Sequence, residues 1–171
     1  MGKRSDFKRR PMDAYQTIDP RAVEILAPHL RGVETFAEPC AGEGKLLGQL
    51  LDLGLYCRWQ SDICRGKDAL ETKFPPVDAI ITNPPWTRDI LHGMIVHFQR
   101  QAPTWLLFDA DWAHTKQAAP YLPQCSHIVA VGRLKWIEDS PHCGKDNVAW
   151  YRFHSQHSEG PRFLGHSLEV A

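Results

Sequence analysis

The stretch VETFAEPCAGEG at residues 33–44 decides the fold. Its first half, residues 33–38, is typical of a short strand, and the chain then enters a turn with glycine at positions 42 and 44. Leucines recur at helical spacing from Leu46 to Leu53, and Gly54 is a typical helix-ending residue. A strand, a glycine-containing turn and a helix in this order predict an α/β sheet with the turn at the carboxyl end of the strand.

Helices and strands also alternate on both sides of this stretch. Before it, Asp19-Pro20 is a typical helix start, and the apolar residues that follow predict a short helix that bends or ends near Pro28. After it, strands are expected at residues 55–60, 77–82 and 104–108, helices at 87–100 and 112–121, and a hairpin of two strands at 127–134 and 148–154. The pattern predicts a three-layer α/β sandwich whose sheet is mostly parallel and ends in an antiparallel C-terminal hairpin.

Length and composition set the organisation of the chain. Its 171 residues fit one domain, which we place at residues 15–155, between a basic, flexible arm at 1–14 and an irregular C-terminal tail at 156–171. The hydrophobic share of 43% argues against a disordered chain, and no apolar run approaches the ~20 residues of a membrane span. The N-terminus lacks the apolar stretch of a signal peptide, so we expect a cytoplasmic protein. Five cysteines without a CxxC pair, and histidines without an HxxxH pair, predict neither a disulfide framework nor a metal site.

Charge is balanced overall but uneven along the chain. The 20 basic residues equal the 20 acidic ones, yet residues 1–10 hold five basic residues and one acidic residue. A neutral domain with a basic arm does not resemble a protein that coats nucleic acid, whose basic surface would be broader. The arm is either a solvated terminus or a segment that contacts phosphates, and the sequence leaves both interpretations open.

A second unusual loop, NPPW at residues 83–86, follows the strand expected at 77–82. Two adjacent prolines restrict the backbone there and can hold the Asn83 amide and the Trp86 ring out from the end of the strand. Parallel strands end at the same edge of a sheet, where ligands bind, so we expect this loop beside the turn at 42–44. The chain lacks the GxxxxGK[ST] spacing of a phosphate-binding loop.

In this order and spacing, Glu38 to Gly44 and Asn83 to Trp86 resemble two motifs of the class I S-adenosylmethionine-dependent methyltransferases. More narrowly they resemble the small phage and prophage DNA N6-adenine methyltransferases, whose catalytic motif is [DNS]-P-P-[YFW]. The resemblance extends from about Tyr15 to Phe153. It implies a Rossmann-like fold, S-adenosylmethionine as cofactor, and methyl transfer to the exocyclic N6 amine of a flipped adenine in DNA.

The resemblance also implies which residues hold the cofactor. These are Tyr15, Thr17, Glu38, Pro39, Cys40, Ala41, Gly42, Gly44, Asp62, Asp68 and Asn83. Thr17 would donate to the cofactor carboxylate, and Glu38 would accept from its ammonium group. Asp62 would accept from the ribose hydroxyls and Asp68 from the adenine amino group, unless either is merely an exposed loop carboxylate.

The catalytic loop implied by the resemblance is Asn83, Pro84, Pro85 and Trp86. The Asn83 side-chain oxygen and the Pro84 carbonyl would each accept a hydrogen bond from the target amine, and Trp86 would stack on the base. Alternatively, Trp86 packs beneath the helix at 87–100. In the hairpin loop, Trp136, Lys145 and Asn147 would contact the substrate, although Trp136 could equally pack on a strand.

One departure from the family leaves the substrate open. Sequence-specific members carry a target-recognition domain, for which residues 87–127 leave no room. Specificity should therefore be low, or supplied by the basic arm, the hairpin loop, a second subunit or another protein. The same catalytic loop occurs in enzymes that methylate adenine N6 in RNA or glutamine in proteins. A catalytically inactive cofactor-binding partner subunit is a further alternative.

Overall fold

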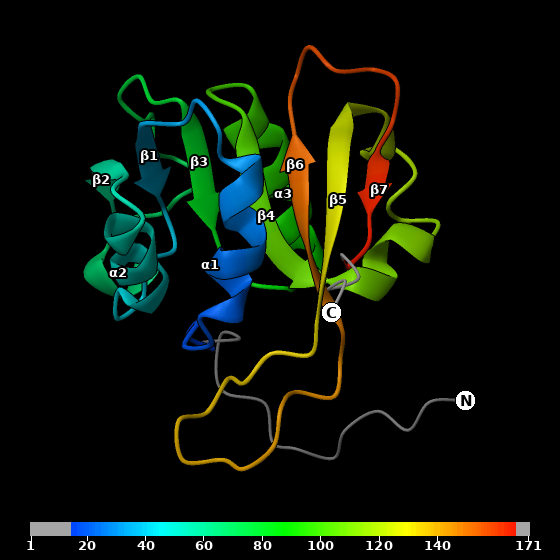
Figure 1. Cartoon of the computed structure of the whole chain (residues 1–171). Helices are drawn as coiled ribbons and strands as arrows, with labels where there is room; N and C mark the ends of the chain where they lie inside the picture. Colours follow the sequence, from blue (N-terminus) through cyan, green and yellow to red (C-terminus); the bar gives the residue numbers. More distant parts are fainter. Residues whose placement is uncertain (1–14, 167–171) are drawn as a thin grey trace.

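A seven-stranded sheet forms the centre of the molecule (Figure 1). The computed structural model describes residues 15–166, so the basic arm expected at 1–14 lies outside the described residues. In the sheet order β2-β1-β3-β4-β6-β5-β7, the strands are β1 (Thr35–Glu38), β2 (Tyr56–Gln60), β3 (Ala79–Thr82), β4 (Thr104–Asp109), β5 (Cys125–Gly132), β6 (Val148–Phe153) and β7 (Arg162–Leu164). Only β6 is antiparallel to its neighbours β4 and β5. The mostly parallel sheet with an antiparallel C-terminal hairpin is thus confirmed.

Helices cover both faces of the sheet. α1 (Arg21–Leu26), which continues into the 3₁₀ turn η2 (Ala27–His29), and α2 (Lys45–Asp52) pack on one face, and α3 (Arg88–Gln99) packs on the other. Figure 1 shows α1 in front of the sheet and α3 behind it. Side chains alternate accordingly, since Ile81 faces α1 and α2 whereas Ile80 faces α3. The three-layer α/β sandwich is confirmed.

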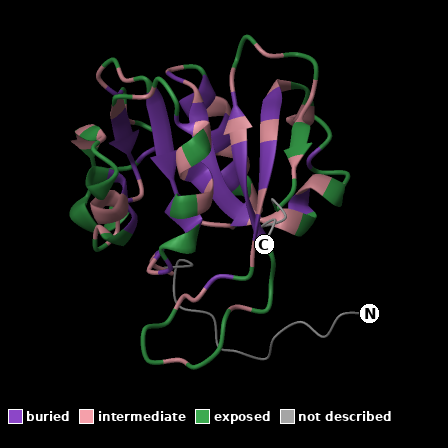
Figure 2. Cartoon of the chain, in the orientation of Figure 1, coloured by how far each residue is buried: buried purple, intermediate pink, exposed green. Residues whose placement is uncertain are grey.

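Large apolar side chains fill both layers, and the central strands are buried (Figure 2). Between α3 and the sheet, the Phe108 and Tyr151 rings stack with centroids 4.1 Å apart, and Trp112 meets Phe108 edge to face at 5.1 Å. Trp112 is fully buried and lies in η4 (Ala110–His114), a 3₁₀ turn. The prediction of a helix at 112–121 is therefore wrong. Packing of Trp112 fixes a tight turn, and Pro120 interrupts any longer helix.

The C-terminal segment also differs from expectation. Residues 162–164 form β7, which pairs in parallel with β5, so the tail expected from residue 156 is not irregular there. A strand of three residues is too short to show a periodic pattern in the sequence. It forms because the edge of β5 offers unpaired backbone groups. A further 3₁₀ turn, η5 (Leu122–Gln124), precedes β5.

Three loops meet at the carboxyl ends of the parallel strands. They are the turn at residues 39–44 after β1, the loop at 83–87 after β3, and the hairpin loop at residues 133–147 between β5 and β6. The hairpin loop extends away from this edge of the sheet (Figure 1). Within residues 15–166, each helix is too short or too polar to traverse a bilayer.

Candidate active site

The turn after β1 is built on two glycines in left-handed conformations. Gly42 has φ 52° and Gly44 has φ 84°, values that side chains with a Cβ rarely adopt. Three hydrogen bonds close the turn: Ala41 N donates to Ser61 O at 2.9 Å, Gly44 N to Ala41 O at 2.7 Å, and Gly42 N to Asp62 Oδ2 at 2.8 Å. These positive φ angles explain why glycine occupies both positions.

Asp62 holds this turn in place. It follows β2, is 9% exposed, and accepts from Gly42 N through one oxygen and from Cys64 N, at 2.9 Å, through the other. Both oxygens keep lone pairs for a ligand, so contact with a ribose stays a prediction. Asp68 lies on an exposed turn, where its Oδ1 accepts from Leu70 N at 2.8 Å.

Glu38, the last residue of β1, is a buried carboxyl group. It is 1% exposed, and its Oε2 has no hydrogen-bond partner within residues 15–166. Burial, assisted by the nearby charge of Asp62, raises the pKa of Glu38 to about 8. Burial also raises the pKa of the neighbouring Cys40 thiol to about 12, which leaves it protonated and a poor nucleophile. A cationic group placed beside Glu38 could donate to Oε2, which accepts from no donor within the described chain.

Asn83, directly after β3, is oriented by the segment at residues 15–17. Its Nδ2 donates to Tyr15 O and to Thr17 Oγ1, both at 3.1 Å. A backbone carbonyl can only accept, so the amide nitrogen must face the segment and Oδ1 must point elsewhere. Gln49 Nε2 on α2 donates to Thr17 O at 2.7 Å and holds the segment from a second side.

These residues enclose a pocket of about 20 Å³. Its lining is Tyr15, Gln16, Thr17, Glu38, Cys40, Ala41, Leu46 and Asn83. A space of this size holds about one water molecule. Gln16 Oε1 accepts from Glu43 N at 3.2 Å, and a Cβ added at Gly42 would overlap with the Gln16 amide. The absence of a Cβ at Gly42 would let a ligand approach the backbone, but the Gln16 side chain fills that space.

The NPPW loop presents an aromatic ring beside the hairpin loop. Pro84 is buried, whereas Trp86 is half-buried and meets Trp136 edge to face, with ring centroids 6.0 Å apart. Two residues beyond Trp86, Arg88 Nη2 bonds Asp109 Oδ2 at 3.0 Å and ties the start of α3 to the end of β4. The structure thus brings Trp136 to the expected catalytic loop. Both expected roles of Trp86, packing and base stacking, are compatible with its partial exposure.

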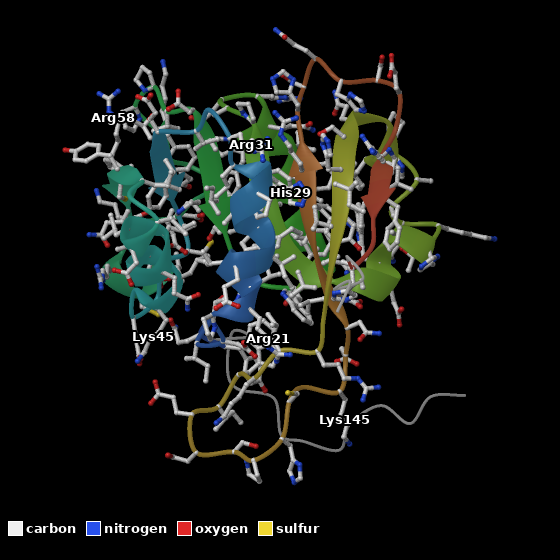
Figure 3. All side chains as sticks on the ribbon, in the orientation of Figure 1. Arg21, His29, Arg31, Lys45, Arg58 and Lys145 are labelled. Atoms are coloured by element: carbon white, nitrogen blue, oxygen red, sulfur yellow. The ribbon has the colours of Figure 1, made fainter. Side chains whose placement is uncertain are left out.

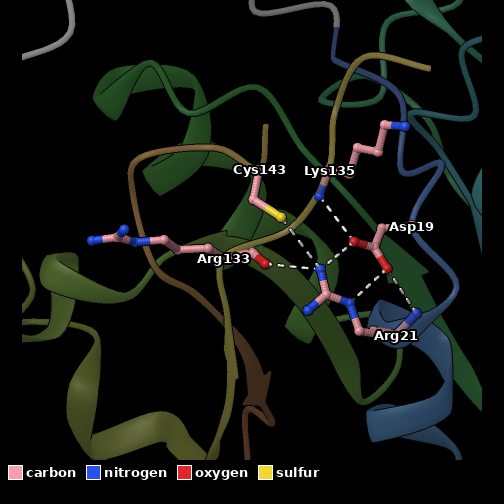
Figure 4. Close-up of polar contacts among 5 residues, drawn as sticks. All are labelled: Asp19, Arg21, Arg133, Lys135 and Cys143. Atoms are coloured by element: carbon pink, nitrogen blue, oxygen red, sulfur yellow. Dashed lines mark hydrogen bonds and ion pairs between the residues drawn. The ribbon is translucent and has the colours of Figure 1, made fainter. Parts of the chain in front are cut away.

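Asp19 and Arg21 anchor the hairpin loop beside the start of α1 (Figure 4). Asp19 is 7% exposed and accepts from Arg21 Nη2 at 2.6 Å and from Lys135 N at 2.9 Å. Arg21 Nη2 also donates to Arg133 O at 3.1 Å and contacts Cys143 Sγ at 3.7 Å. The loop therefore has a fixed base from which Trp136 reaches Trp86.

The other contacts of the hairpin loop involve residues that do not line the pocket. Lys45 Nζ on α2 pairs with Glu138 Oε1 at 2.8 Å, an exposed contact of small energetic weight. The side chains of Lys145 and Asn147 are exposed, and Asn147 O accepts from Ala110 N at 2.9 Å. Neither lines the pocket at Glu38, so their contact with a substrate stays a prediction.

Comparisons with known proteins support the fold. No protein-family model and no curated protein sequence matches this chain. A structure described as an RNA methyltransferase from Pyrococcus horikoshii matches with a TM-score of 0.61 and 17% identity, over 84% of this chain and 88% of the other. The chain has the fold of the class I methyltransferases.

Two further structures share this methyltransferase fold. A dimethyladenosine transferase from Plasmodium falciparum matches at a TM-score of 0.56 and 15% identity, over 82% of this chain. The present chain spans 63% of the length of that transferase. A protein described as a class I S-adenosylmethionine-dependent methyltransferase from Listeria monocytogenes matches at 0.56 and 11% identity, over 91% of this chain and 67% of the other.

Sequence reasoning missed three residues that shape the site of this methyltransferase fold. Gln16 lies between the expected cofactor residues Tyr15 and Thr17, and only this position in the sequence could have indicated its role. Gln49 is a polar residue among the leucines of α2, and Arg21 is one of many charged residues. Their partners Thr17 and Arg133 are 32 and 112 residues away in the sequence, and local patterns do not register such contacts.

Asp19→Asn tests the anchor of the hairpin loop. The amide nitrogen would face donors that now bond a carboxylate oxygen, so we expect the free energy of unfolding to fall by about 2 kcal/mol at pH 7. Hydrogen bonding from Arg21 lowers the pKa of Asp19. The stabilisation is therefore complete above the ordinary carboxyl pKa and is lost as pH falls through the lowered value. Urea unfolding at pH 7 and pH 3 should show the difference from wild type shrinking at pH 3.

The matched control is Asp139→Asn, which removes the same charge from an exposed position in the same loop. It should leave stability within about 0.5 kcal/mol of wild type. An Asp19 variant as stable as this control would show that the contacts in Figure 4 do not hold the loop.

Proposed function

We propose that this chain is an S-adenosylmethionine-dependent methyltransferase that methylates the exocyclic N6 amine of adenine in DNA. The observation that carries the proposal is the fixed orientation of Asn83. Its amide nitrogen is bonded to Tyr15 and Thr17, and the side chain lines one pocket with the buried carboxyl group of Glu38. A site for a cationic cofactor and an oriented acceptor for an amine thus adjoin at one edge of the sheet.

The residues present fit the cofactor chemically. Bound S-adenosylmethionine would supply an electrophilic methyl group on a positively charged sulfur. Glu38 Oε2 offers an acceptor to the ammonium group, and the Thr17 hydroxyl retains its proton for donation to the carboxylate. The pocket as it stands is too small, so the Gln16 side chain must leave the face of Gly42 before the cofactor can enter.

In the transfer, the protein mainly positions the target amine. The Asn83 Oδ1 and the Pro84 carbonyl each accept one N–H bond and so aim the nitrogen lone pair at the methyl group. They also stabilise the positive charge that develops on nitrogen. Because an amide is no strong base, the proton leaves to water after transfer.

Adenine in DNA suits the surroundings of Asn83. The half-buried Trp86, with Trp136 against it, offers a ring for a base extruded from the duplex. The basic residues at 1–10 can neutralise a few phosphates, so DNA affinity should fall with added salt. Few side chains remain to read base edges, which favours modest sequence specificity.

The test is incubation of the purified chain with methyl-labelled cofactor and, separately, duplex DNA, RNA and a protein mixture. Nucleosides and amino acids are then analysed by mass spectrometry. N6-methyladenosine from RNA, or methylglutamine, in place of N6-methyldeoxyadenosine would overturn the substrate. Absence of transfer to all three would overturn the activity.

Gln16→Ala is expected to tighten cofactor binding several-fold. Removal of the amide opens the face of Gly42 without touching Glu38 or Asn83, so the binding-competent form no longer has to be reached by displacing Gln16. Calorimetric titration of the variant, beside wild type and the exposed control Gln117→Ala, checks this. Weaker binding by Gln16→Ala than by the control would show that Gln16 holds the cofactor and does not block it.

A further inference from the structure

A row of basic side chains crosses the sheet at the edge opposite the active site. Pairing between strands places Trp105 on β4 beside Arg152 on β6, Arg152 beside His127 on β5, and His127 beside Arg162 on β7. Residues paired in register lie on the same face of a sheet, here the face that carries α1. We call Arg152, His127 and Arg162 the cationic row.

No residue of the cationic row takes part in an ion pair within the described chain. The three ion pairs found among residues 15–166 involve Arg21, Lys45 and Arg88, and none reaches this row. Adjacent like charges across strands destabilise a sheet, so three basic groups side by side need an explanation. Burial lowers the pKa of His127, and the charges of Arg152, His29, Arg162 and His157 lower it further.

These neighbours come from several elements around His127. Arg152 and Arg162 flank it on β6 and β7, His29 approaches from η2, and His157 lies in the loop between β6 and β7. His29 and His127 each lie about 6 Å from the Trp105 ring, at 6.2 and 6.1 Å between centroids. All four of these neighbours are basic, so together they disfavour the charged form of His127.

Ser126 fixes the geometry of the row. Its hydroxyl donates to Arg152 O at 3.2 Å and accepts from Arg152 Nη1 at 3.0 Å, while His127 Nδ1 lies 2.9 Å from the same oxygen. Because the single hydroxyl proton is already used, His127 Nδ1 carries the proton in this bond and Nε2 is left as the outer nitrogen. On protonation, Nε2 becomes a second N–H donor of the ring.

The row is open to a ligand. Arg162 is exposed, and Arg152 and His127 are half-buried. α1 packs on Val129 and Val131, nearer the carboxyl end of β5, and Figure 1 shows no helix in front of the other end in the part of the chain described. In Figure 3, His29 lies at the far end of α1 from Arg21 and the hairpin loop, so this surface is separate from the active site.

We propose that the cationic row, together with His29, is a binding site for a phosphate group. Two guanidinium groups and a histidine on adjacent strands supply several N–H donors to one anion, and arginine matches phosphate geometry through paired hydrogen bonds. The phosphate belongs either to a nucleic-acid backbone or to a free anion, which share this chemistry. The proposal stands whether or not the chain transfers methyl groups.

NMR titration of the histidine rings tests the site on the folded, full-length protein. Inorganic phosphate is expected to raise the pKa of His127 by about 1, because an anion within 4–6 Å favours the charged imidazole. The ring of His142, in the hairpin loop at the other edge, serves as the internal reference and should not respond. Arg162→Ala should raise the phosphate concentration at the midpoint about tenfold. Arg100→Ala, an exposed arginine at the end of α3 on the opposite face, should leave the midpoint unchanged.

A second arm separates the two sources of phosphate. A short DNA duplex is titrated against wild type, Arg162→Ala and Arg100→Ala by fluorescence anisotropy at several salt concentrations. If the DNA backbone is the ligand, Arg162→Ala lowers the slope of log affinity against log salt by about 0.9. Arg100→Ala keeps the wild-type slope. Equal slopes, with the pKa of His127 still raised by inorganic phosphate, identify a free anion as the ligand. If inorganic phosphate leaves the pKa of His127 unchanged and the duplex slopes of wild type and Arg162→Ala are equal, the site is overturned.

Discussion

Asn83→Ala is expected to lower kcat for methyl transfer by about 10²–10³. The estimate takes one oriented acceptor on the amine to be worth as much as one oxyanion-hole donor. The variant also loses the bonds from Nδ2 to Tyr15 O and Thr17 Oγ1, so some loss of cofactor affinity should accompany the loss of turnover. Steady-state kinetics with saturating cofactor, beside calorimetric cofactor titration, separates the two effects.

Thr17→Val is the matched control for Asn83→Ala. It removes one acceptor of the Asn83 nitrogen and leaves Oδ1 in place, so cofactor affinity should fall while kcat at saturation stays within about tenfold of wild type. If Asn83→Ala keeps wild-type turnover at saturating cofactor, the acceptor for the amine lies elsewhere.

Glu38→Gln is expected to change both stability and cofactor binding. The pKa of Glu38 is raised to about 8 in the folded protein, so between its ordinary value and pH 8 the folded state binds more protons than the unfolded state. Wild-type stability from this group is therefore full below about pH 4.5 and falls as pH rises to about 8. The fall amounts to about 5 kcal/mol. The glutamine variant cannot titrate and should lack this part of the slope.

Urea unfolding between pH 5 and pH 8 measures that slope for wild type, Glu38→Gln and the exposed control Glu34→Gln. The control should keep the wild-type slope. Calorimetry at pH 8 should show much weaker binding of S-adenosylmethionine to Glu38→Gln, because the carboxylate that faces the ammonium group is gone. Unchanged binding would place the ammonium group away from β1.

The sequence predicted the elements whose residues repeat with a clear period. The leucine spacing predicted a helix after Gly44, and the structure has α2 there. The apolar runs predicted strands at residues 77–82 and 104–108, where the structure has β3 and β4. The prediction that two loops meet at one sheet edge was also sound, because parallel strands between helices must end on the same side. Asn83 and Glu38 line one pocket for that reason.

The features that the sequence did not predict depend on contacts between distant residues. Gln16 fills the face of Gly42, and Asp62 bonds Gly42 N from 20 residues away. Strand β7 forms only because β5 offers an edge, and the cationic row exists only once β4, β5, β6 and β7 are in register. None of these contacts produces a periodic pattern in the sequence.

The most direct test of the central claim is nucleoside mass spectrometry of DNA from cells that express the wild-type chain or Asn83→Ala. The account predicts N6-methyladenine in several sequence contexts with wild type, and at background level with the variant. DNA without N6-methyladenine in cells that contain folded wild-type protein would contradict it.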